Sequence, residues 1–145
     1  MSFEPNMAPI HFVGLHWARV WNGHDGVAMA ALFHPDATYT DPFAGTIPTA
    51  TVPSMIARIH ELFPDYVFDL VGAVTEAQLK GRRTLALQWL MRGTQPRTGK
   101  AIALPGVDFL EFEGGLIRRA NTYFDMAALQ QQSGLTAEEL ILRAN

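Results

Sequence analysis

Two aspartates are the residues of this chain best suited to chemistry. Asp41 ends a short strand-like segment over residues 37–41, and Asp108 lies within the otherwise apolar stretch 104–110. A carboxylate among apolar side chains must be neutralised, paired or used, because burying its charge unaided is unfavourable. The chain has no cysteine, and its five histidines show no recognised metal-binding spacing. The two carboxyl groups therefore predict acid–base chemistry without a cofactor or a metal ion.

Each aspartate also has a purely structural interpretation. Side chains alternate along a strand, so Asp41 shares a face with Tyr39, and it also suits a strand end where it accepts backbone hydrogen bonds in a turn. Asp108 shares its face with Leu110 and Phe112. Such neighbours would raise its pKa and favour the protonated acid, a donor for a developing oxyanion. The alternative for Asp108 is an ion pair with an arginine or lysine on a neighbouring strand.

Hydrophobic periodicity predicts the elements that position these residues. Apolar residues at helical spacing predict a helix over 9–22, a short helix capped by Asp25 and running to Phe33, and a third helix that ends near Phe63. A short strand is expected over 37–41, and residues 45–51 look rich in turns. Four later segments have a two-residue period and predict strands: 66–74, 82–92, 100–112 and 116–124. A capping box at Thr136–Glu139 predicts a terminal helix. Helices followed by an antiparallel meander indicate an α+β fold.

Composition narrows the class of protein. The 145 residues suit a single domain over 1–145, and 48% hydrophobic residues with 17% charged residues are typical of a compact globular protein. The net charge is −3 and the basic residues are scattered, which argues against a nucleic-acid partner. No signal-peptide pattern and no membrane-length apolar run occurs in the sequence, so we expect a cytoplasmic protein with no membrane partner.

Several phrases of the sequence, in their order and spacing, resemble those of the SnoaL-like polyketide cyclases. That family belongs to the nuclear transport factor 2-like superfamily, which also includes ketosteroid isomerase. The resemblance spans about residues 10–132 and rests on the phrases Ala30–Ala37, Phe63–Asp65, Pro105–Asp108 and Tyr123–Asp125. It implies a cone, in which a strongly curved antiparallel sheet wraps around helices and encloses an apolar pocket. It also implies a homodimer through the sheet, with Phe109 on the convex face.

The same resemblance assigns expected roles. Asp41 corresponds to the general base of ketosteroid isomerase. Asp108 falls where that enzyme has a carboxylic acid that stays neutral and donates a hydrogen bond. Trp17 stands where ketosteroid isomerase has an oxyanion-binding tyrosine, although a tryptophan on an apolar helix face is more often core. Asp125 resembles the acid–base aspartate of SnoaL-like cyclases, and with Asn121 and Tyr123 it would form a polar row. The alternative for Asp125 is an N-cap for the following helix.

Two classes of function remain open. The first is a cofactor-independent lyase or isomerase that acts on a small hydrophobic carbonyl compound through an enolate. The second is a non-catalytic module of the same fold that binds a small ligand or dimerises, because fold alone does not fix function. In either case we expect Asp41 and Asp108 to reach into one pocket. Its expected apolar lining is Trp17, Tyr39, Met55, Ile59, Trp89 and Phe124.

Overall fold

The computed structural model describes residues 10–141, without the side chains of His11 and Leu79. Its helices are α1 (Ile10–Asn22), α2 (Gly26–Ala30), a short 3₁₀ turn (Thr49–Thr51), α3 (Val52–Leu62), α4 (Met126–Ser133) and α5 (Ala137–Leu140). Its strands are β1 (Phe33–Asp41), β2 (Gly45–Pro48), β3 (Val67–Leu70), β4 (Thr75–Leu79), β5 (Arg82–Thr94), β6 (Ala101–Glu113) and β7 (Leu116–Phe124). The helix predictions are confirmed in position, and Asp25 caps α2 as expected.

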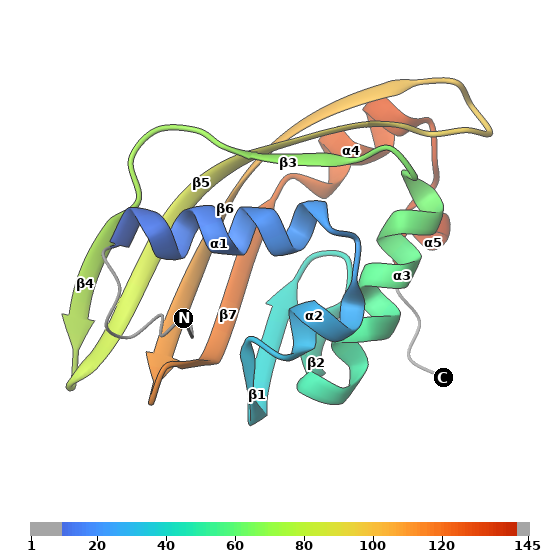
Figure 1. Ribbon diagram of the computed structural model, residues 1–145. Coiled ribbons are helices and arrows are strands. Elements are labelled where there is room, and N and C mark those ends of the chain that lie inside the picture. Colours follow the sequence, from blue (N-terminus) through green and yellow to red (C-terminus); the bar gives the residue numbers. More distant parts are fainter. Residues whose placement is uncertain (1–9, 142–145) are drawn as a thin grey trace.

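The strands form one curled sheet in the order β2-β1-β7-β6-β5-β3, and β4 pairs with the other half of β5. All neighbouring pairs are antiparallel except β1 and β7, which run parallel. Figure 1 shows α1, α2 and α3 on one side of this sheet, with α1 lying across the strands. The predicted α+β cone is therefore confirmed.

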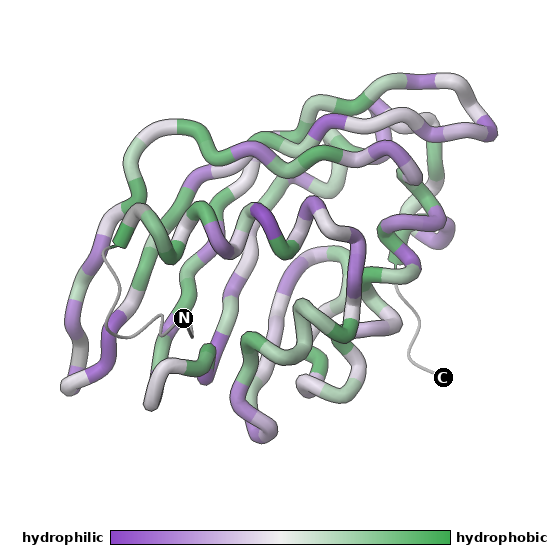
Figure 2. The backbone as a smooth tube through the Cα atoms, viewed as in Figure 1, coloured by the Kyte–Doolittle hydropathy of each residue, from purple (hydrophilic) through white to green (hydrophobic). Residues whose placement is uncertain are grey.

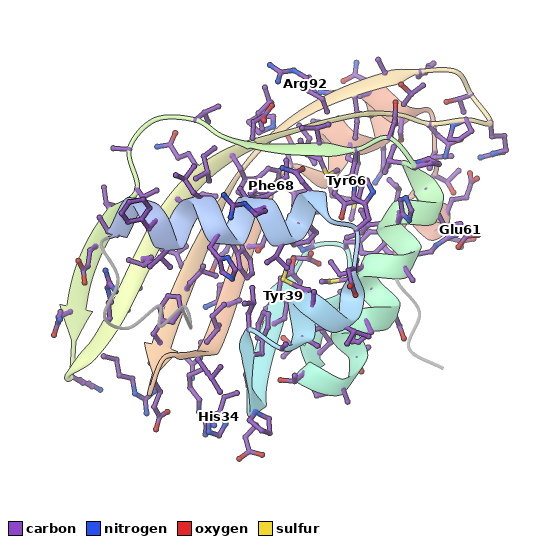
Figure 3. All side chains as sticks on the ribbon, viewed as in Figure 1. His34, Tyr39, Glu61, Tyr66, Phe68 and Arg92 are labelled. Atoms are coloured by element: carbon purple, nitrogen blue, oxygen red, sulfur yellow. The ribbon has the colours of Figure 1, made fainter. Side chains whose placement is uncertain are left out.

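The core lies between these helices and the concave face of the sheet. Along β5, Leu85, Leu87, Trp89 and Met91 are all buried and form one apolar row on the concave face. Hydrophobic and hydrophilic positions alternate along the long strands (Figure 2), as a sheet with one covered face requires. On the opposite face of β5, Arg92 is exposed and its side chain points away from the core (Figure 3).

Two edge strands were not predicted from the sequence. Strand β2 lies in the segment interpreted as turns, and its burial pattern contains a single buried residue, Ile47. Strand β4 is mostly polar and pairs only with β5, where Glu76 forms an ion pair with Arg83 at 2.6 Å. The expected second helix is also shorter, since α2 ends at Ala30 and Phe33 already begins β1. These short edge elements derive their conformation from strand pairing, so their local sequence carries little signal.

A β-bulge between β6 and β7 determines what faces Asp108. Counting back from the hairpin pair Glu113–Leu116 without a bulge would place Asp108 opposite Asn121. The register shifts between Glu111 and Phe112, and Asp108 pairs instead with Thr122. A one-residue slip exchanges the two faces of a strand, so the bulge turns Thr122 toward the core and leaves Asn121 on the other face.

Candidate active site

The concave face of the sheet and the helices enclose an apolar pocket that contains both predicted aspartates. Its free volume is about 40 Å³, enough for a few water molecules. Figure 3 shows Tyr39 and Phe68, two of its wall residues, in the space between the helices and the sheet. Its lining comprises Trp21, Tyr39, Asp41, Phe43, Ile59, Phe63, Phe68, Trp89, Met91, Leu104, Asp108, Thr122, Phe124 and Leu129.

Asp108 lies on β6 with its side chain completely enclosed. The indole Nε1–H of Trp17 donates to its Oδ2 at 2.8 Å, and the hydroxyl of Thr122 donates to its Oδ1 at 2.5 Å. No ion pair within residues 10–141 involves Asp108, so the predicted alternative of an arginine or lysine partner is not realised. Two neutral donors thus take the place of a counter-ion.

Burial raises the pKa of Asp108 from its ordinary value to about 6. The hydrogen bonds from Thr122 and Trp17 oppose this rise because they stabilise the carboxylate, whereas the charge of Asp41 adds to it. A group with this pKa can hold or release a proton near neutral pH, which is the range useful for acid–base chemistry.

Asp41 lies at the end of β1 and is also buried. The hydroxyl of Tyr39 donates to its Oδ2 at 2.6 Å, and the backbone N–H of Ala44 donates to its Oδ1 at 2.6 Å. Burial raises the pKa of Asp41, while these hydrogen bonds and one from the Phe43 backbone lower it. The turn predicted as the structural interpretation is therefore present, and the same carboxyl group lines the pocket.

The two carboxyl groups act on one another electrostatically. The pKa of Tyr39 is raised well above its ordinary value, first by burial and then by the nearby charges of Asp41 and Asp108. Asp41 also raises the pKa of Asp108. Both carboxyl groups have raised pKa values, so a negative charge on one of them disfavours ionisation of the other.

The predicted apolar lining lies largely around this pair. Tyr39, Ile59, Trp89 and Phe124 line the pocket. Met55 is fully buried on α3 but lies outside the lining. Trp17, the last predicted lining residue, also lies outside the pocket lining. It is buried, and its N–H donates to Asp108.

The expected polar row on β7 faces away from the pocket. Tyr123 is exposed, and Asp125 caps α4 by accepting a hydrogen bond from the backbone N–H of Ala128 at 3.1 Å. Asp125 is exposed and does not line the pocket. The expectation that Asn121, Tyr123 and Asp125 line a pocket is therefore wrong, because the bulge between β6 and β7 reverses which residues of β7 face inward.

The sequence analysis missed two residues that shape the site. Thr122 is the cross-strand partner of Asp108, and only the position of the bulge reveals it. Gly106 lies opposite Trp89 in the neighbouring strand, and a Cβ there would come within 2.2 Å of the indole ring. The absence of a side chain at Gly106 is what allows the Trp89 ring to lie flat over β6. A glycine inside a predicted strand is the signal that could have indicated this close approach.

Two polar groups in the pocket wall have no hydrogen-bond partner among residues 10–141. The indole nitrogens of Trp21 and Trp89 are buried and make no hydrogen bond within this range. The N–H of Trp89 lies near enough to Asp108 to lower the pKa of that carboxyl group, but no hydrogen bond of ordinary geometry joins them. A buried donor without an acceptor typically destabilises a protein by about 1–3 kcal/mol. Such groups are rare in native proteins, so both indoles call for an explanation.

The outer face of the sheet carries an exposed aromatic pair. Phe109 is 40% exposed and Tyr123 is 58% exposed, with their ring centroids 6.0 Å apart. Phe109 thus points away from the pocket, as predicted. None of the helices in the described part of the chain has the length and hydrophobicity needed to span a bilayer.

Comparisons with solved structures place this arrangement among known folds. A nuclear transport factor 2-like protein from Burkholderia thailandensis is 26% identical, with 90% of this chain and 98% of that chain covered at a TM-score of 0.71. A Catenulispora acidiphila protein of ketosteroid isomerase-like fold, solved with trimethylamine, is 20% identical. The match covers 86% of this chain and 94% of that chain at a TM-score of 0.72. The epoxide hydrolase/cyclase-like enzyme SalBIII, which acts in pyran ring formation in salinomycin, is 15% identical. The match covers 81% of this chain and 92% of that chain at a TM-score of 0.68.

The sequence comparisons are consistent with these structures. No curated protein matches the chain. The family model of the SnoaL-like domain matches residues 15–120, which include Asp41, Asp108 and most of the pocket. The chain therefore belongs to the SnoaL-like domain family.

Proposed function

We propose that the pocket is the active site of a cofactor-independent lyase or isomerase that acts on a small hydrophobic carbonyl compound through an enolate. The observation that carries this proposal is the pair of buried carboxyl groups, Asp41 and Asp108, both with raised pKa values and both facing one apolar pocket. Raised pKa values in a cleft are typical of acid–base sites.

Asp41 is the proposed base. Its carboxylate is the more easily ionised of the pair, because Tyr39 and the backbone of Phe43 and Ala44 stabilise its charge. The carboxylate removes a proton from the carbon next to the substrate carbonyl. The electron pair of that C–H bond forms a carbon–carbon double bond, and the carbonyl oxygen takes the negative charge.

Asp108 is the proposed acid. Below a pH of about 6 its carboxyl group keeps the proton, and it can donate a hydrogen bond to the enolate oxygen. Trp17 and Thr122 fix the carboxyl group in place, so it needs no reorganisation when charge develops. Return of the proton from Asp41 to another carbon gives an isomerase, and attack of the enolate on a second carbonyl gives an aldol-type cyclase.

Substrate entry requires side chains to move. The free volume of about 40 Å³ is far below the roughly 300–1,000 Å³ of typical ligand pockets. Met91 and Phe124 line the pocket, and Phe124 is partly exposed. The unbranched thioether of Met91 changes rotamer readily, which suits a residue that must yield to a ligand.

The proposed partner on the outside of the molecule is a second copy of this chain. The aromatic pair Phe109 and Tyr123 lies on the convex sheet face, where exposed apolar side chains favour burial against another surface. A homodimer through this face would leave the pocket on the opposite side of the sheet unobstructed.

Deuterium exchange of a model ketone tests the catalytic proposal. 2-Tetralone is flat and apolar and has acidic C–H bonds beside its carbonyl, so the protein should speed its exchange in D₂O, followed by proton NMR. We expect Asp41→Asn to lower the catalysed rate by about two to four orders of magnitude. Asp108→Asn should lower it less, since the amide still donates a hydrogen bond.

Asp125→Asn is the matched control, because it removes a carboxyl group that lies outside the pocket. Unchanged exchange in Asp41→Asn and Asp108→Asn would contradict the mechanism. Loss of exchange only in Asp125→Asn would move the site to the end of β7. Binding of 2-tetralone without exchange would leave the non-catalytic binding module as the better account.

A further inference from the structure

We propose that the indole N–H groups of Trp21 and Trp89 form a subsite that binds an acceptor oxygen of the ligand, and that they select a flat carbonyl compound. This inference deepens the proposed function and rests on its assumption that the pocket binds a carbonyl substrate. Its own basis is different, however, because it comes from two donors that have no partner in the described part of the chain.

An indole N–H can only donate a hydrogen bond, and it keeps its proton throughout the accessible pH range. Trp21 and Trp89 are 6% and 4% exposed, so bulk water does not satisfy these donors. Both residues line the pocket. Asp108 lies beside the Trp89 N–H, but no hydrogen bond of ordinary geometry joins them, and no acceptor within residues 10–141 pairs with either indole. The ligand is therefore the inferred source of the acceptor oxygen.

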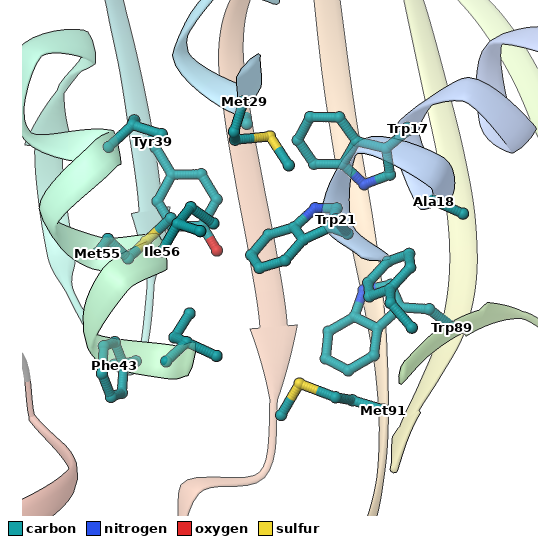
Figure 4. Packing of buried hydrophobic residues seen from close by; sticks show 14 of the residues in the cluster. Trp17, Ala18, Trp21, Met29, Tyr39, Phe43, Met55, Ile56, Trp89 and Met91 are labelled. Atoms are coloured by element: carbon teal, nitrogen blue, oxygen red, sulfur yellow. The ribbon is translucent and has the colours of Figure 1, made fainter. Parts of the chain in front are cut away.

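The third tryptophan, Trp17, differs from Trp21 and Trp89 because its indole N–H has an acceptor. Trp17 donates to Asp108 at 2.8 Å and cannot also serve a ligand. Figure 4 shows Trp17, Trp21 and Trp89 grouped together in the buried cluster. Trp89 also lies beside the carboxyl group of Asp108. An oxygen held by the Trp89 N–H would thus lie next to the proposed acid.

The rings that carry these donors are held rigidly. Phe68 stacks on Trp21 with centroids 5.5 Å apart, and it contacts Trp89 with centroids 5.2 Å apart. Gly106 leaves the space that the Trp89 ring occupies. Donors whose positions are fixed before binding lose little entropy when the ligand arrives, which favours tight and selective recognition.

The chemistry of the subsite defines the class of ligand. Aromatic walls favour a flat, unsaturated skeleton, and fixed N–H donors require an acceptor oxygen such as that of a ketone or an enolate. A hydrocarbon of the same shape would leave both donors unpaired. The subsite therefore selects aromatic or conjugated ketones over hydrocarbons.

Proton–nitrogen NMR on the intact protein tests this inference directly. The chain has three tryptophans, so it gives three indole N–H signals, which single Trp→Phe variants assign. The probes are 2-naphthol, whose oxyanion resembles an enolate, and 2-tetralone, with naphthalene as the control that lacks oxygen. We expect the oxygen probes to move the Trp21 and Trp89 N–H signals downfield, as new hydrogen bonds do, and to move the Trp17 signal less.

Affinity gives a second, independent readout. Trp89→Phe should weaken 2-naphthol binding by about 10- to 100-fold, as loss of a hydrogen bond to a charged or strongly polar oxygen does, and leave naphthalene binding nearly unchanged. Trp17→Phe is the matched variant, and it should not reproduce this selectivity for oxygen. If a phenylalanine variant fails to fold, the signals of the unmodified protein still decide the matter.

The outcomes separate this inference from the proposed function. Downfield indole signals without ketone exchange would support the subsite and overturn the catalytic proposal. Ketone exchange without any movement of the Trp21 and Trp89 signals would support catalysis and overturn the subsite. Failure of both oxygen probes to bind, or equal binding of naphthalene and 2-naphthol, would also overturn it.

Discussion

Replacing Asp108 by asparagine should remove a large part of the pH dependence of folding stability. The substitution keeps the size of the side chain and its pairing. The amide oxygen accepts from Trp17, and the amide N–H₂ donates to the hydroxyl oxygen of Thr122, which has free lone pairs. The substitution therefore removes the ionisable proton and leaves both neighbours with a hydrogen-bond partner.

The magnitude follows from the pKa of Asp108. Burial raises it from 3.8 to about 6, so between these values the folded protein holds a proton that the unfolded chain has released. The free energy of unfolding is therefore highest below about pH 4, and it falls as the pH rises through about 6. A shift of two units corresponds to about 3 kcal/mol. Relative to wild type, Asp108→Asn should gain about this much stability between about pH 4 and pH 7.

Urea unfolding followed by tryptophan fluorescence at several pH values measures this difference. The comparison with wild type removes the part of the pH dependence that Asp41 contributes independently of Asp108, and the electrostatic coupling between the two carboxyl groups stays in the difference. Asp36→Asn controls for removal of a carboxylate at an exposed position of β1. A stability difference for Asp108→Asn that stays flat with pH, within about 1 kcal/mol, would refute the claim that the pocket raises the pKa of Asp108.

Three further predictions address the base, the pocket wall and the outer face. Tyr39→Phe removes a hydrogen bond that lowers the pKa of Asp41, so the acidic limb of the ketone exchange profile should move to higher pH; an unmoved limb would argue against Asp41 as the base. Gly106→Ala places a Cβ within 2.2 Å of Trp89 and should destabilise the fold by about 1–3 kcal/mol in urea unfolding; unchanged stability would mean that the indole is free to move. Phe109→Glu should convert a dimer to a monomer in light scattering without affecting ketone exchange, and a wild-type protein that is already monomeric would contradict the proposed dimer.

Periodicity predicted those parts of the fold that have one buried face. Alternation along β6 correctly placed Asp108 inward with Leu110 and Phe112, and alternation along β5 placed Trp89 on the same face. These residues obey the pattern because regular strands enforce it over many positions. Asp41 was identified from the same alternation together with the resemblance of this chain to ketosteroid isomerase.

The parts that sequence could not predict depend on contacts between distant residues. The bulge between β6 and β7 inserts one extra residue into β7, and the sequence analysis did not predict it. That single residue decides that Thr122, and not Asn121, meets Asp108. The use of the Trp17 N–H was equally hidden, because its partner lies 91 residues away in the chain.

The pH dependence of ketone exchange tests the division of roles between the two carboxyl groups most directly. The catalysed rate, after subtraction of the rate without protein, should rise as Asp41 ionises and fall as Asp108 loses its proton near pH 6. Asp108→Asn should lose the descending limb, because its amide cannot ionise, and Asp41→Asn should lose the catalysed rate. A wild-type rate that keeps rising through about pH 8, with the same profile in Asp108→Asn, would contradict an acid role for Asp108.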